Sequence, residues 1–573
     1  MQVGFQTDTH AGRQRVDSDG PYSHPRLPVT QSADDSPAAL SRRQLITATG
    51  LAAAGLAVAT PASAASVGGI VRPKRPRQTP PFESLRDWLA AMEEWGLLVR
   101  FRDVDQDAWE ATAIMYHLVD QYGSYGAPVA IFENVKIGGR WYKGPVVGNY
   151  QGHWHQEAIL WGLEPDLTDA RNSYRTGLAH MVKLLQANKG DYPQVPPVVV
   201  ARERAPCKEV VLEGDDIDIT AFPFIQGNPG DAGRYINTGS TFSADPEWQQ
   251  NFGTYRCQIL GPRLIHLNSE PNQTGHRMFL RARERGEKSM RIAVVLGQDP
   301  VTWLVSGSRV PITPRKPVDE LAYVGGMRGK PLEVVKADLS DLLIPAHSEM
   351  VIEGEIDLTE WVAEGPYHET YGYLGNRNTD RFRFTVQRVT HRKNPIIMNS
   401  FTSIGGGFCK APMDAYSDVL WKQRYPQINQ IYYHDEAKGV TFISIRKDQA
   451  GRGLEIAKAY SERSLIAKIV VVVDDDLDVM NQSEMLLALG SRWQPGKGSE
   501  IYPTKPASFF EPSSADGKTT SKIAIDATMQ WAEEGGPTEF PALNRNLFDQ
   551  AAAPDIYETI LTKWPEQLTR KPW

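Results

Sequence analysis

The chain has 573 residues, which is long enough for two to four domains. Hydrophobic residues make up 41% of it and charged residues 23%, as in ordinary soluble globular proteins. The net charge of -7 argues against a nucleic-acid-binding protein and a basic membrane-surface protein, because both need a local excess of lysine and arginine. Three cysteines, Cys207, Cys257 and Cys409, have neither disulfide nor zinc-site spacing and predict core thiols.

Residues 1–65 have the pattern of a cleavable export signal. Arg42 and Arg43 precede an apolar run from Leu45 to about Ala59, and small residues follow it. These regions in this order predict the twin-arginine route and a periplasmic or extracellular protein, or a cytoplasmic one if the signal does not function. The run is too short and too rich in alanine to span a bilayer permanently, and we expect no integral membrane span. The alternative is a disordered tail with a chance alanine run.

Residues 80–205 predict an N-terminal α/β domain. Apolar residues recur at helical spacing from Phe82 to Trp95, and the strand-like run LLVRF follows. Residues 128–136 and 145–149 are typical of strands, and 168–189 are typical of a helix. The proline-rich run DYPQVPPVVV then marks the predicted domain boundary.

The pattern changes to short β-rich runs and turns in residues 206–400, which predicts a central domain built as a barrel or a sandwich. Residues 401–430 predict a linker helix region. Residues 431–573 alternate between helical and strand patterns, with a buried strand at 469–473, and predict a C-terminal α/β domain. The expected fold class is therefore mixed α/β.

Two acids lie close together in the segment EGPYHE, at Glu364 and Glu369. Pro366 favours a loop or strand over a helix, so both carboxylates can point into one cavity. In a low-dielectric pocket, either one pKa rises or a cation lies between such acids. Arg256, at the entry to a predicted strand, is a candidate cation because its planar fork binds carboxylates well. The alternative is a solvated turn.

Asn251, His276 and Glu320 together offer an amide oxygen, an imidazole and a carboxylate. This mixed set suits manganese or magnesium, particularly where a phosphate completes the ligand shell. Each residue alone also has a structural explanation, as a turn cap, a surface histidine and an acid at a helix start.

Three other polar or glycine-rich motifs have simpler explanations. His153 and His155 in GHWH lack a third ligand and are predicted to be surface residues. The GGG run at 405–407 lacks the lysine of a phosphate loop and predicts a turn near the substrate mouth. Asp474–Asp476 are expected to end a buried strand and meet solvent.

Taken together, the motifs resemble the UbiD-type decarboxylase family. The matching runs are NFGTYRCQILG, GGMRGKPLEVVKADLSDLLIPAHSEMVIEGEI, EGPYHETYGYLG, ISIRK and KIVVVVDDDLDVMN, in family order from about residue 82 onward. The resemblance implies a split β-barrel flavin-binding domain in the centre. It also implies a homo-oligomer, a dimer or hexamer, that assembles through the C-terminal domain.

The resemblance implies a reversible, non-oxidative decarboxylase of an aromatic, heteroaromatic or α,β-unsaturated carboxylic acid. Its cofactor would be prenylated FMN, obtained from a prenyl-flavin synthase, with Mn²⁺ or Mg²⁺ and potassium as a further candidate ion. Carbon dioxide would leave from a covalent cofactor–substrate adduct. Three alternatives stay open: an inactive flavin- or metal-binding subunit of a carboxylase complex, an enzyme that works as a carboxylase, and a metal-dependent hydrolase without flavin.

The same resemblance implies a role for each site residue. Arg256 would orient the substrate carboxylate, Glu364 would fix Arg256, and Glu369 would stay free to carry the proton. Asn251, His276 and Glu320 would bind the metal that bridges the cofactor phosphate, and Lys447 would face that phosphate. The implied cofactor-binding set is Asn251, Thr254, Tyr255, Arg256, His276, Ser306, Ser308, Glu320 and Lys447.

His368 stands where the family commonly has glycine before the second acid. An imidazole at this position could reshape the pocket, hydrogen-bond a polar substituent of the substrate, or point outward. We expect an aromatic or heteroaromatic acid more than a simple acrylate.

Overall fold

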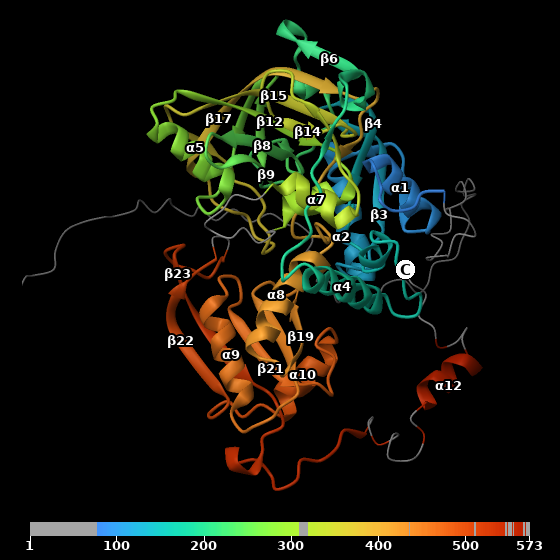
Figure 1. The fold of residues 1–573 in the computed structure, drawn as a ribbon, viewed down its shortest axis with the longest axis vertical. Helices are drawn as coiled ribbons and strands as arrows, with labels where there is room; N and C mark the ends of the chain where they lie inside the picture. The colour runs from blue at the N-terminus through green and yellow to red at the C-terminus, as the bar shows by residue number, and fades with distance from the viewer. Residues whose placement is uncertain are drawn as a thin grey trace, which may run out of the picture. The chain divides into compact units, whose positions relative to one another are not determined.

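The structure is a computed structural model that describes residues 77–573. Undescribed within that range are residues 309–318, 435, 509–510, 545–546, 548–552, 554, 565–567 and 569–573. The predicted export signal lies outside the described residues. The described part contains four β-sheets with helices packed around them (Figure 1). None of its helices is long and apolar enough to cross a membrane.

The N-terminal part contains a small mixed sheet. Helix α1 begins after Ser84, whose side chain accepts the Asp87 backbone N–H, and it buries Trp88 and Met92 as its apolar spacing predicts. The sheet has the order β1-β3-β4-β18, with β2 beside β3. Its elements are α1 (Leu85–Glu94), β1 (Leu98–Phe101), β2 (Val104–Asp105), α2 (Glu110–Tyr122), β3 (Val129–Ile137), β4 (Arg140–Gly148), α3 (Gln156–Ile159), α4 (Ala170–Ala187) and β18 (Ile397–Met398).

The central part is a curled antiparallel sheet of ten strands with the order β7-β10-β11-β17-β15-β12-β8-β9, and β6 and β16 also pair with β17. The sheet has the form of a half-barrel and not that of a sandwich. Its strands are β6 (Val210–Glu213), β7 (Tyr235–Ile236), β8 (Ser240–Asp245), β9 (Gln249–Thr254), β10 (Cys257–Gly261), β11 (Leu264–Leu267), β12 (Ser289–Leu296), β15 (Met350–Asp357), β16 (Val362–Glu364) and β17 (Asn378–His391).

The long strand β17 organises this sheet because it pairs along its length with β11, β15, β6 and β16. Phe382 and Phe384 of β17 are fully buried and pack with Phe279 of α5 in the core of the sheet. The remaining elements are α5 (Thr274–Glu284), α6 (Pro300–Gly307), α7 (Glu320–Arg328) and a three-stranded sheet of β5 (Val198–Val199), β13 (Glu333–Lys336) and β14 (Leu343–Pro345).

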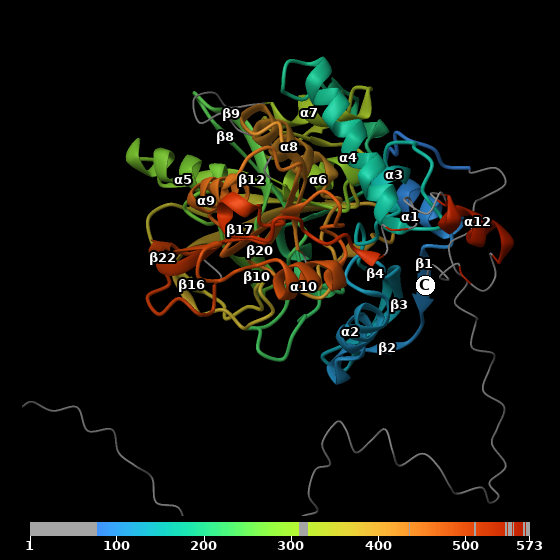
Figure 2. The ribbon, with the colours of Figure 1, turned by 90° about the horizontal axis from the view of Figure 1, so that it is seen from below.

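The C-terminal part has a five-stranded sheet with the order β19-β20-β21-β23-β22. The predicted buried strand is β21, which lies between two parallel neighbours. Helix α8 packs against α4 of the N-terminal part, as both ribbon views show (Figure 2). The elements are α8 (Ala411–Arg424), β19 (Ile428–Tyr433), β20 (Val440–Ile445), α9 (Arg452–Arg463), β21 (Ile469–Asp474), α10 (Gln482–Ser491), β22 (Ser499–Pro506), β23 (Thr519–Asp526) and α12 (Ile556–Lys563).

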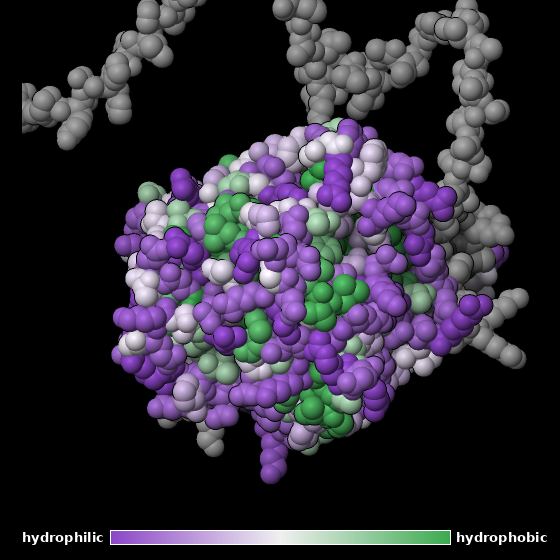
Figure 3. Space-filling model, turned by 90° about the horizontal axis from the view of Figure 1, so that it is seen from above, coloured by the Kyte–Doolittle hydropathy of each residue, from purple (hydrophilic) through white to green (hydrophobic). Residues whose placement is uncertain are grey.

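The mixed α/β fold class is confirmed. Cys207, Cys257 and Cys409 are buried and free, as predicted. The surface in Figure 3 is mostly hydrophilic, with apolar residues gathered in separate small patches.

Candidate active site

Arg256 and Glu364 form a buried ion pair that joins the end of β16 to the connection between β9 and β10. Arg256 lies between β9 and β10, and Glu364 is the last residue of β16. The Arg256 Nε and Nη2 atoms each donate a hydrogen bond of 2.9 Å to a different oxygen of Glu364. Asn378 Nδ2 donates to the same carboxylate at 3.2 Å, and Glu364 is fully buried. This geometry fixes the guanidinium along one edge.

Glu369 lies in the turn that follows β16, on the other side of the same guanidinium. Arg256 Nη1 donates to Glu369 Oε1 at 2.6 Å. The turn is closed by hydrogen bonds from Glu369 N to Tyr373 O, 2.9 Å, and from Gly375 N to Tyr367 O, 2.8 Å. A Cβ at Gly375 would lie 2.7 Å from Glu369 Cγ, so only glycine lets the carboxylate lie there.

The sequence prediction left Glu369 free of Arg256, and in this respect the structure differs. The guanidinium carries a donor group beyond the edge that Glu364 occupies, and Glu369 takes it. Burial raises the pKa of Glu369; Arg256 lowers it, the charges of Glu364 and Glu270 raise it, and the net pKa lies above its ordinary value. Burial opposes the charge on Arg256, but its bonds to both glutamates outweigh this and raise its pKa.

The Tyr367 ring packs against the face of the Arg256 guanidinium. The Arg256 guanidinium lies over the Tyr367 ring, 4.5 Å from its centroid, in a cation–π contact. The Tyr367 hydroxyl accepts from Asn237 Nδ2 at 3.0 Å and lies 3.1 Å from Thr402 Oγ1. Both contacts hold the ring at its hydroxyl end, and the fixed ring restricts the position of Arg256.

A cavity of about 370 Å³ lies on the outer side of Glu369. Its walls include Glu369, Glu270, Arg381 and Asp380, and also Tyr373, which is largely exposed. Glu369 is thus the member of the cluster that faces open space.

Asn251, inside β9, lies against Glu320, the first residue of α7. Asn251 Nδ2 donates to Glu320 Oε1, and the Phe252 backbone N–H donates to Glu320 Oε2 at 3.3 Å. Burial raises the pKa of Glu320 to about 8, although these hydrogen bonds lower it. The Asn251 Oδ1 atom is buried and has no hydrogen-bond partner among the described residues.

His276 lies on α5, which packs on the strand face that carries Asn251. Asn251 pairs with Ser243 across β9 and β8, and Ser243 Oγ contacts Met278 of α5 at 3.5 Å. His276 Nδ1 lies 3.0 Å from both Ser269 O and Ser269 Oγ, which leaves Nε2 for a ligand. No direct contact joins His276 to Glu320, and the described residues contain no cluster of three histidine, cysteine or acidic groups around one point.

Thr254, Ser306 and Tyr255 are held close to these strands. Thr254 Oγ1 lies 2.8 Å from Ser306 Oγ, which accepts from Ser240 Oγ at 2.7 Å. The Tyr255 hydroxyl accepts the Gly275 backbone N–H at 3.0 Å and so holds the start of α5, next to His276. Ser308 follows α6, and its N–H donates to Leu304 O at 2.9 Å.

Two family models match the chain over more than half of its length. The model of the 3-octaprenyl-4-hydroxybenzoate carboxy-lyase Rift-related domain matches residues 198–405, and the model of the corresponding C-terminal domain matches residues 408–527. The chain belongs to the UbiD family. The family's members are carboxy-lyases, and the chain is accordingly an enzyme of this class.

Solved structures of UbiD-class enzymes are similar over almost their whole length. Vanillic acid decarboxylase from Sedimentibacter hydroxybenzoicus, in open form, is 26% identical with a TM-score of 0.70, over 84% of this chain and 99% of that chain. HmfF from Pelotomaculum thermopropionicum, in complex with FMN, is 28% identical with a TM-score of 0.68, over 82% and 98%. An evolved dimeric form of HmfF, in complex with prFMN, is 26% identical with a TM-score of 0.66 over 82% and 98%.

The polar groups that the central sheet leaves unpaired could bind a polar group such as the phosphate of a flavin. Besides Asn251 Oδ1, the buried atoms Thr241 Oγ1 and Gln298 Oε1 have no hydrogen-bond partner among the described residues. Gln298 Nε2 donates to Ser240, which continues the hydroxyl chain to Ser306. Buried polar atoms without partners are rare and are commonly satisfied by a water, an ion or a ligand, so this group of atoms fits a polar ligand.

Lys447 is the one predicted cofactor residue that the structure holds elsewhere. Its ammonium donates to Thr528 Oγ1 at 3.0 Å, to Met529 O at 2.9 Å and to Glu534 Oε2 at 2.5 Å. All three partners belong to the C-terminal part of the chain. In this arrangement Lys447 does not join the Asn251 and Arg256 groups.

Two predictions about histidines and aspartates were wrong. His153 and His155 are buried: His153 Nδ1 accepts the His155 backbone N–H at 3.1 Å, and His155 Nδ1 lies 3.0 Å from Ser173 Oγ. Asp474 ends β21 and Asp475 is exposed, as predicted, but Asp474 is buried and binds Arg492 together with Asp476.

The glycine run 405–407 lies beside a small pocket that Trp303, Met398 and Asn399 also line.

His368 does not point outward: it is buried and binds Asp231, a partner that sequence reasoning missed. Asp231 lies 137 positions away in a turn-like run, so the sequence carries no local signal for the pair.

Proposed function

We propose that the enzyme is a prenylated-FMN-dependent decarboxylase of an aromatic, heteroaromatic or α,β-unsaturated carboxylic acid. The observation that carries the proposal is the contact of Arg256 with both Glu364 and Glu369. A fixed cation beside a raised-pKa acid is what substrate carboxylate binding and protonation at carbon require. Prenylated FMN, when bound, supplies the electron sink for loss of carbon dioxide from an sp² carbon.

Arg256 is the proposed site for the substrate carboxylate. Glu364 occupies the Nε and Nη2 edge, so the substrate must bind at the edge that includes Nη1. Glu369 now occupies that donor at 2.6 Å. An incoming carboxylate therefore competes with Glu369 for Arg256.

This competition leads to protonation of Glu369. Arg256 is the main group that lowers the pKa of Glu369. When the substrate takes over Nη1 and adds its own negative charge, the pKa of Glu369 rises further and the carboxyl group takes up a proton. After carbon dioxide leaves, Glu369 gives this proton to the substrate carbon, and the adjacent cavity lets solvent replace it.

The cofactor would be held by the groups around β8, β9, α5 and α7. Asn251, His276 and Glu320 would bind Mn²⁺ or Mg²⁺, which neutralises the cofactor phosphate, with potassium as a further candidate ion. Thr254, Tyr255, Ser306 and Ser308 would complete the site through their hydroxyl groups. A prenyl-flavin synthase would supply the cofactor.

We also propose that residues 1–65 export the folded enzyme by the twin-arginine route.

A homo-oligomer is proposed in addition. Exposed leucines on α10, Leu486 and Leu487, and exposed Ile501 on β22 support an interface on the C-terminal part. HmfF has an evolved dimeric form, which favours the same expectation.

The test is production of the enzyme together with a prenyl-flavin synthase. We expect a bound flavin in the absorbance spectrum, and release of carbon dioxide from at least one acid in a panel of benzoates, furoates and acrylates. Bound flavin with no turnover of any panel acid would favour an inactive flavin-binding subunit. A protein without flavin after this treatment would contradict the proposal.

A further inference from the structure

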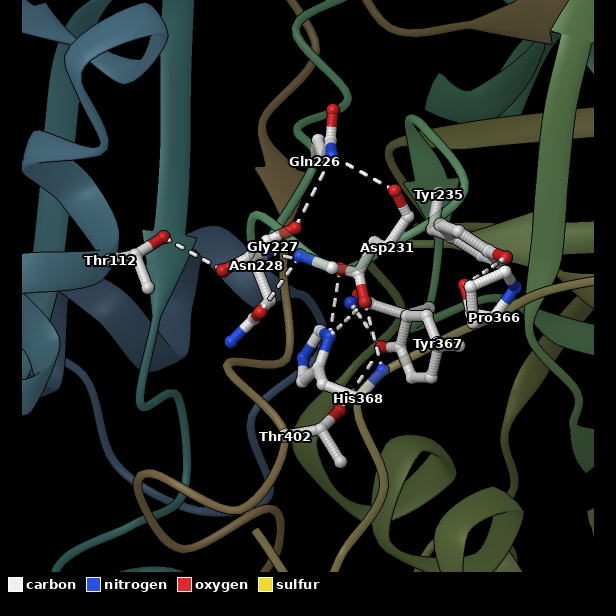
Figure 4. Close-up of polar contacts among 12 residues, drawn as sticks. Thr112, Gln226, Gly227, Asn228, Asp231, Tyr235, Pro366, Tyr367, His368 and Thr402 are labelled. Carbon is white, nitrogen blue, oxygen red and sulfur yellow. Dashed lines mark hydrogen bonds and ion pairs between the residues drawn. The ribbon is translucent and has the colours of Figure 1, made fainter. Parts of the chain in front are cut away.

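His368 and Asp231 form a buried pair directly beside the proposed proton carrier. Asp231 accepts three hydrogen bonds: from His368 Nδ1 at 2.8–2.9 Å, from the His368 backbone N–H at 2.8 Å and from the Asn228 N–H at 3.0 Å. Figure 4 shows the imidazole directed at the carboxylate. Since a carboxylate only accepts, Nδ1 carries the proton, and Asp231 fixes both the ring and the backbone of His368.

Asp231 is itself held in a closed loop. Its backbone N–H donates to Asn228 O at 3.0 Å, and Gln226 Nε2 donates to Asp231 O at 2.9 Å. The loop is attached to α2 of the N-terminal part, because Thr112 Oγ1 donates to Gly227 O at 2.9 Å (Figure 4). The carboxylate therefore has a fixed position relative to the first sheet.

The same loop is in close contact with the segment on both sides of His368. Ala232 N donates to Pro366 O at 2.8 Å. A Cβ at Gly227 would lie 2.9 Å from His368 Cε1, and a Cβ at Gly230 would lie 2.9 Å from two methyl carbons of Leu374, which pairs with His368 in a β-bridge. Gly227 is thus required for the contact, because Asp231 holds the imidazole in place, whereas the leucine methyl carbons can turn aside.

We propose that Asp231 and His368 are positioning residues for the decarboxylation. Through them the loop fixes the two residues that flank the imidazole: Tyr367, whose ring carries the guanidinium, and Glu369, whose carboxylate binds it. The Tyr367 and His368 rings lie 4.2 Å apart, so a shift of the imidazole moves the tyrosine. The inference rests on the proposed function.

The geometry favours positioning over contact with the substrate. His368 is only 6% exposed, and it lines none of the described cavities beside Glu369 or the glycine run 405–407. Its Nδ1 is occupied by Asp231. The imidazole therefore acts through its neighbours in the chain, and a displacement of about 1 Å at Glu369 is enough to cost about 100-fold in rate.

The test compares His368→Ala, His368→Asn, His368→Gln and Asp231→Asn in the flavin-loaded enzyme, with the acid that the panel identifies as substrate. The asparagine amide can place a donor where Nδ1 lies, whereas glutamine places it nearer Nε2. We expect kcat to fall about 10- to 100-fold in the alanine, glutamine and Asp231→Asn variants, with KM and flavin content within about twofold. His368→Asn should regain most of kcat. His347→Asn, at another histidine–carboxylate contact of 2.8 Å, is the matched control and should keep kcat.

A readout without turnover separates this inference from the proposed function. Hydrogen–deuterium exchange of the peptide over residues 364–376 should rise in Asp231→Asn and His368→Ala, but not in His368→Asn or His347→Asn. If the wild-type enzyme turns over none of the acids, the proposed function is contradicted. The exchange result alone then decides whether Asp231 and His368 position the segment. Unchanged exchange, equal rates in the alanine and asparagine variants, or a loss in KM and flavin content alone would overturn the positioning role.

Discussion

Arg256 binds Glu364 through two parallel hydrogen bonds, with Nε and Nη2 each 2.9 Å from a different carboxylate oxygen. The pair is buried and joins β16 to the β9–β10 turn. Glu369 binds the same cation through one bond and lies beside a cavity. The two acids therefore differ in how firmly they bind Arg256: Glu364 is fixed, whereas a substrate carboxylate can displace Glu369.

Glu369→Gln should abolish turnover and keep the cofactor. The amide matches the carboxyl group in size but cannot deliver its proton, so we expect kcat to fall at least about 100-fold. Deuterium exchange at the product carbon in heavy water should disappear as well. Carbon dioxide release and the flavin absorbance measure the two effects. Asp380→Asn removes another acid from the same cavity wall and should change kcat less than about threefold; an equal loss there would count against Glu369.

Glu364→Gln should move the pH dependence of kcat to lower pH. Glu369 must be protonated to act, so wild-type kcat falls as the pH rises through its raised pKa. The charge of Glu364 contributes to that raised pKa, so its removal lowers the pKa of Glu369. Rate profiles from pH 5 to 9 give the shift. Asn378→Ala removes a neutral contact to Glu364 and should leave the profile in place, whereas a shift to higher pH in Glu364→Gln would refute the assignment.

Much of the fold follows from local sequence patterns. The helix after Ser84, the strand at 469–473 and the helix at 168–189 each have a periodicity or cap that acts within a few residues. The order of the strands in the central sheet does not follow from local patterns, because β17 pairs with strands more than 100 residues earlier in the chain, such as β11. Such pairings depend on the packing of the whole core.

The candidate site shows the same division. Glu364 and Glu369 are close in sequence, which suggests a shared cation, and Arg256 could be predicted as that cation from the sequence. Asp231 could not be named, because its run QGNPGD has the composition of an exposed turn. The burial of His155 was missed for a related reason, because its hydrogen-bond partner Ser173 lies in α4, 18 positions further along the chain.

Loss of the proposed metal ligands should lower metal content and flavin retention together. Asn251→Ala and Glu320→Gln each remove an oxygen donor, and we expect at least about 10-fold weaker binding of Mn²⁺. The pKa of Glu320, about 8, adds a pH effect: the carboxyl group must lose a proton to bind the ion, so affinity should rise from pH 6 to 8. Titration calorimetry in two buffers measures the released proton. Ser243→Ala, on the strand partner of Asn251, should behave as wild type; proton-free binding would contradict the prediction.

Glu157 provides a test of stability away from the site. Its two oxygens accept the Lys410 and Ala411 N–H groups, at 2.7 and 3.2 Å, at the start of α8. Burial raises its pKa from 4.5 to about 8, although these bonds lower it. The unfolded chain loses this proton near pH 4.5 and the folded chain near pH 8, so its stabilising effect is complete below pH 4.5 and is lost as the pH rises to 8.

The unfolding free energy of the wild type should therefore fall between pH 5 and 8 relative to Glu157→Gln, by at most about 1.4 kcal/mol per pH unit. Urea unfolding at pH 5, 6, 7 and 8 measures this difference, and only the slope matters, because the glutamine also changes the contact with Ala411. Glu203→Gln, at an exposed acid, should keep the wild-type slope. If Glu157→Gln followed the wild type at every pH, the carboxyl group would already be ionised in the folded enzyme, and the buried cap on α8 would be a charged one.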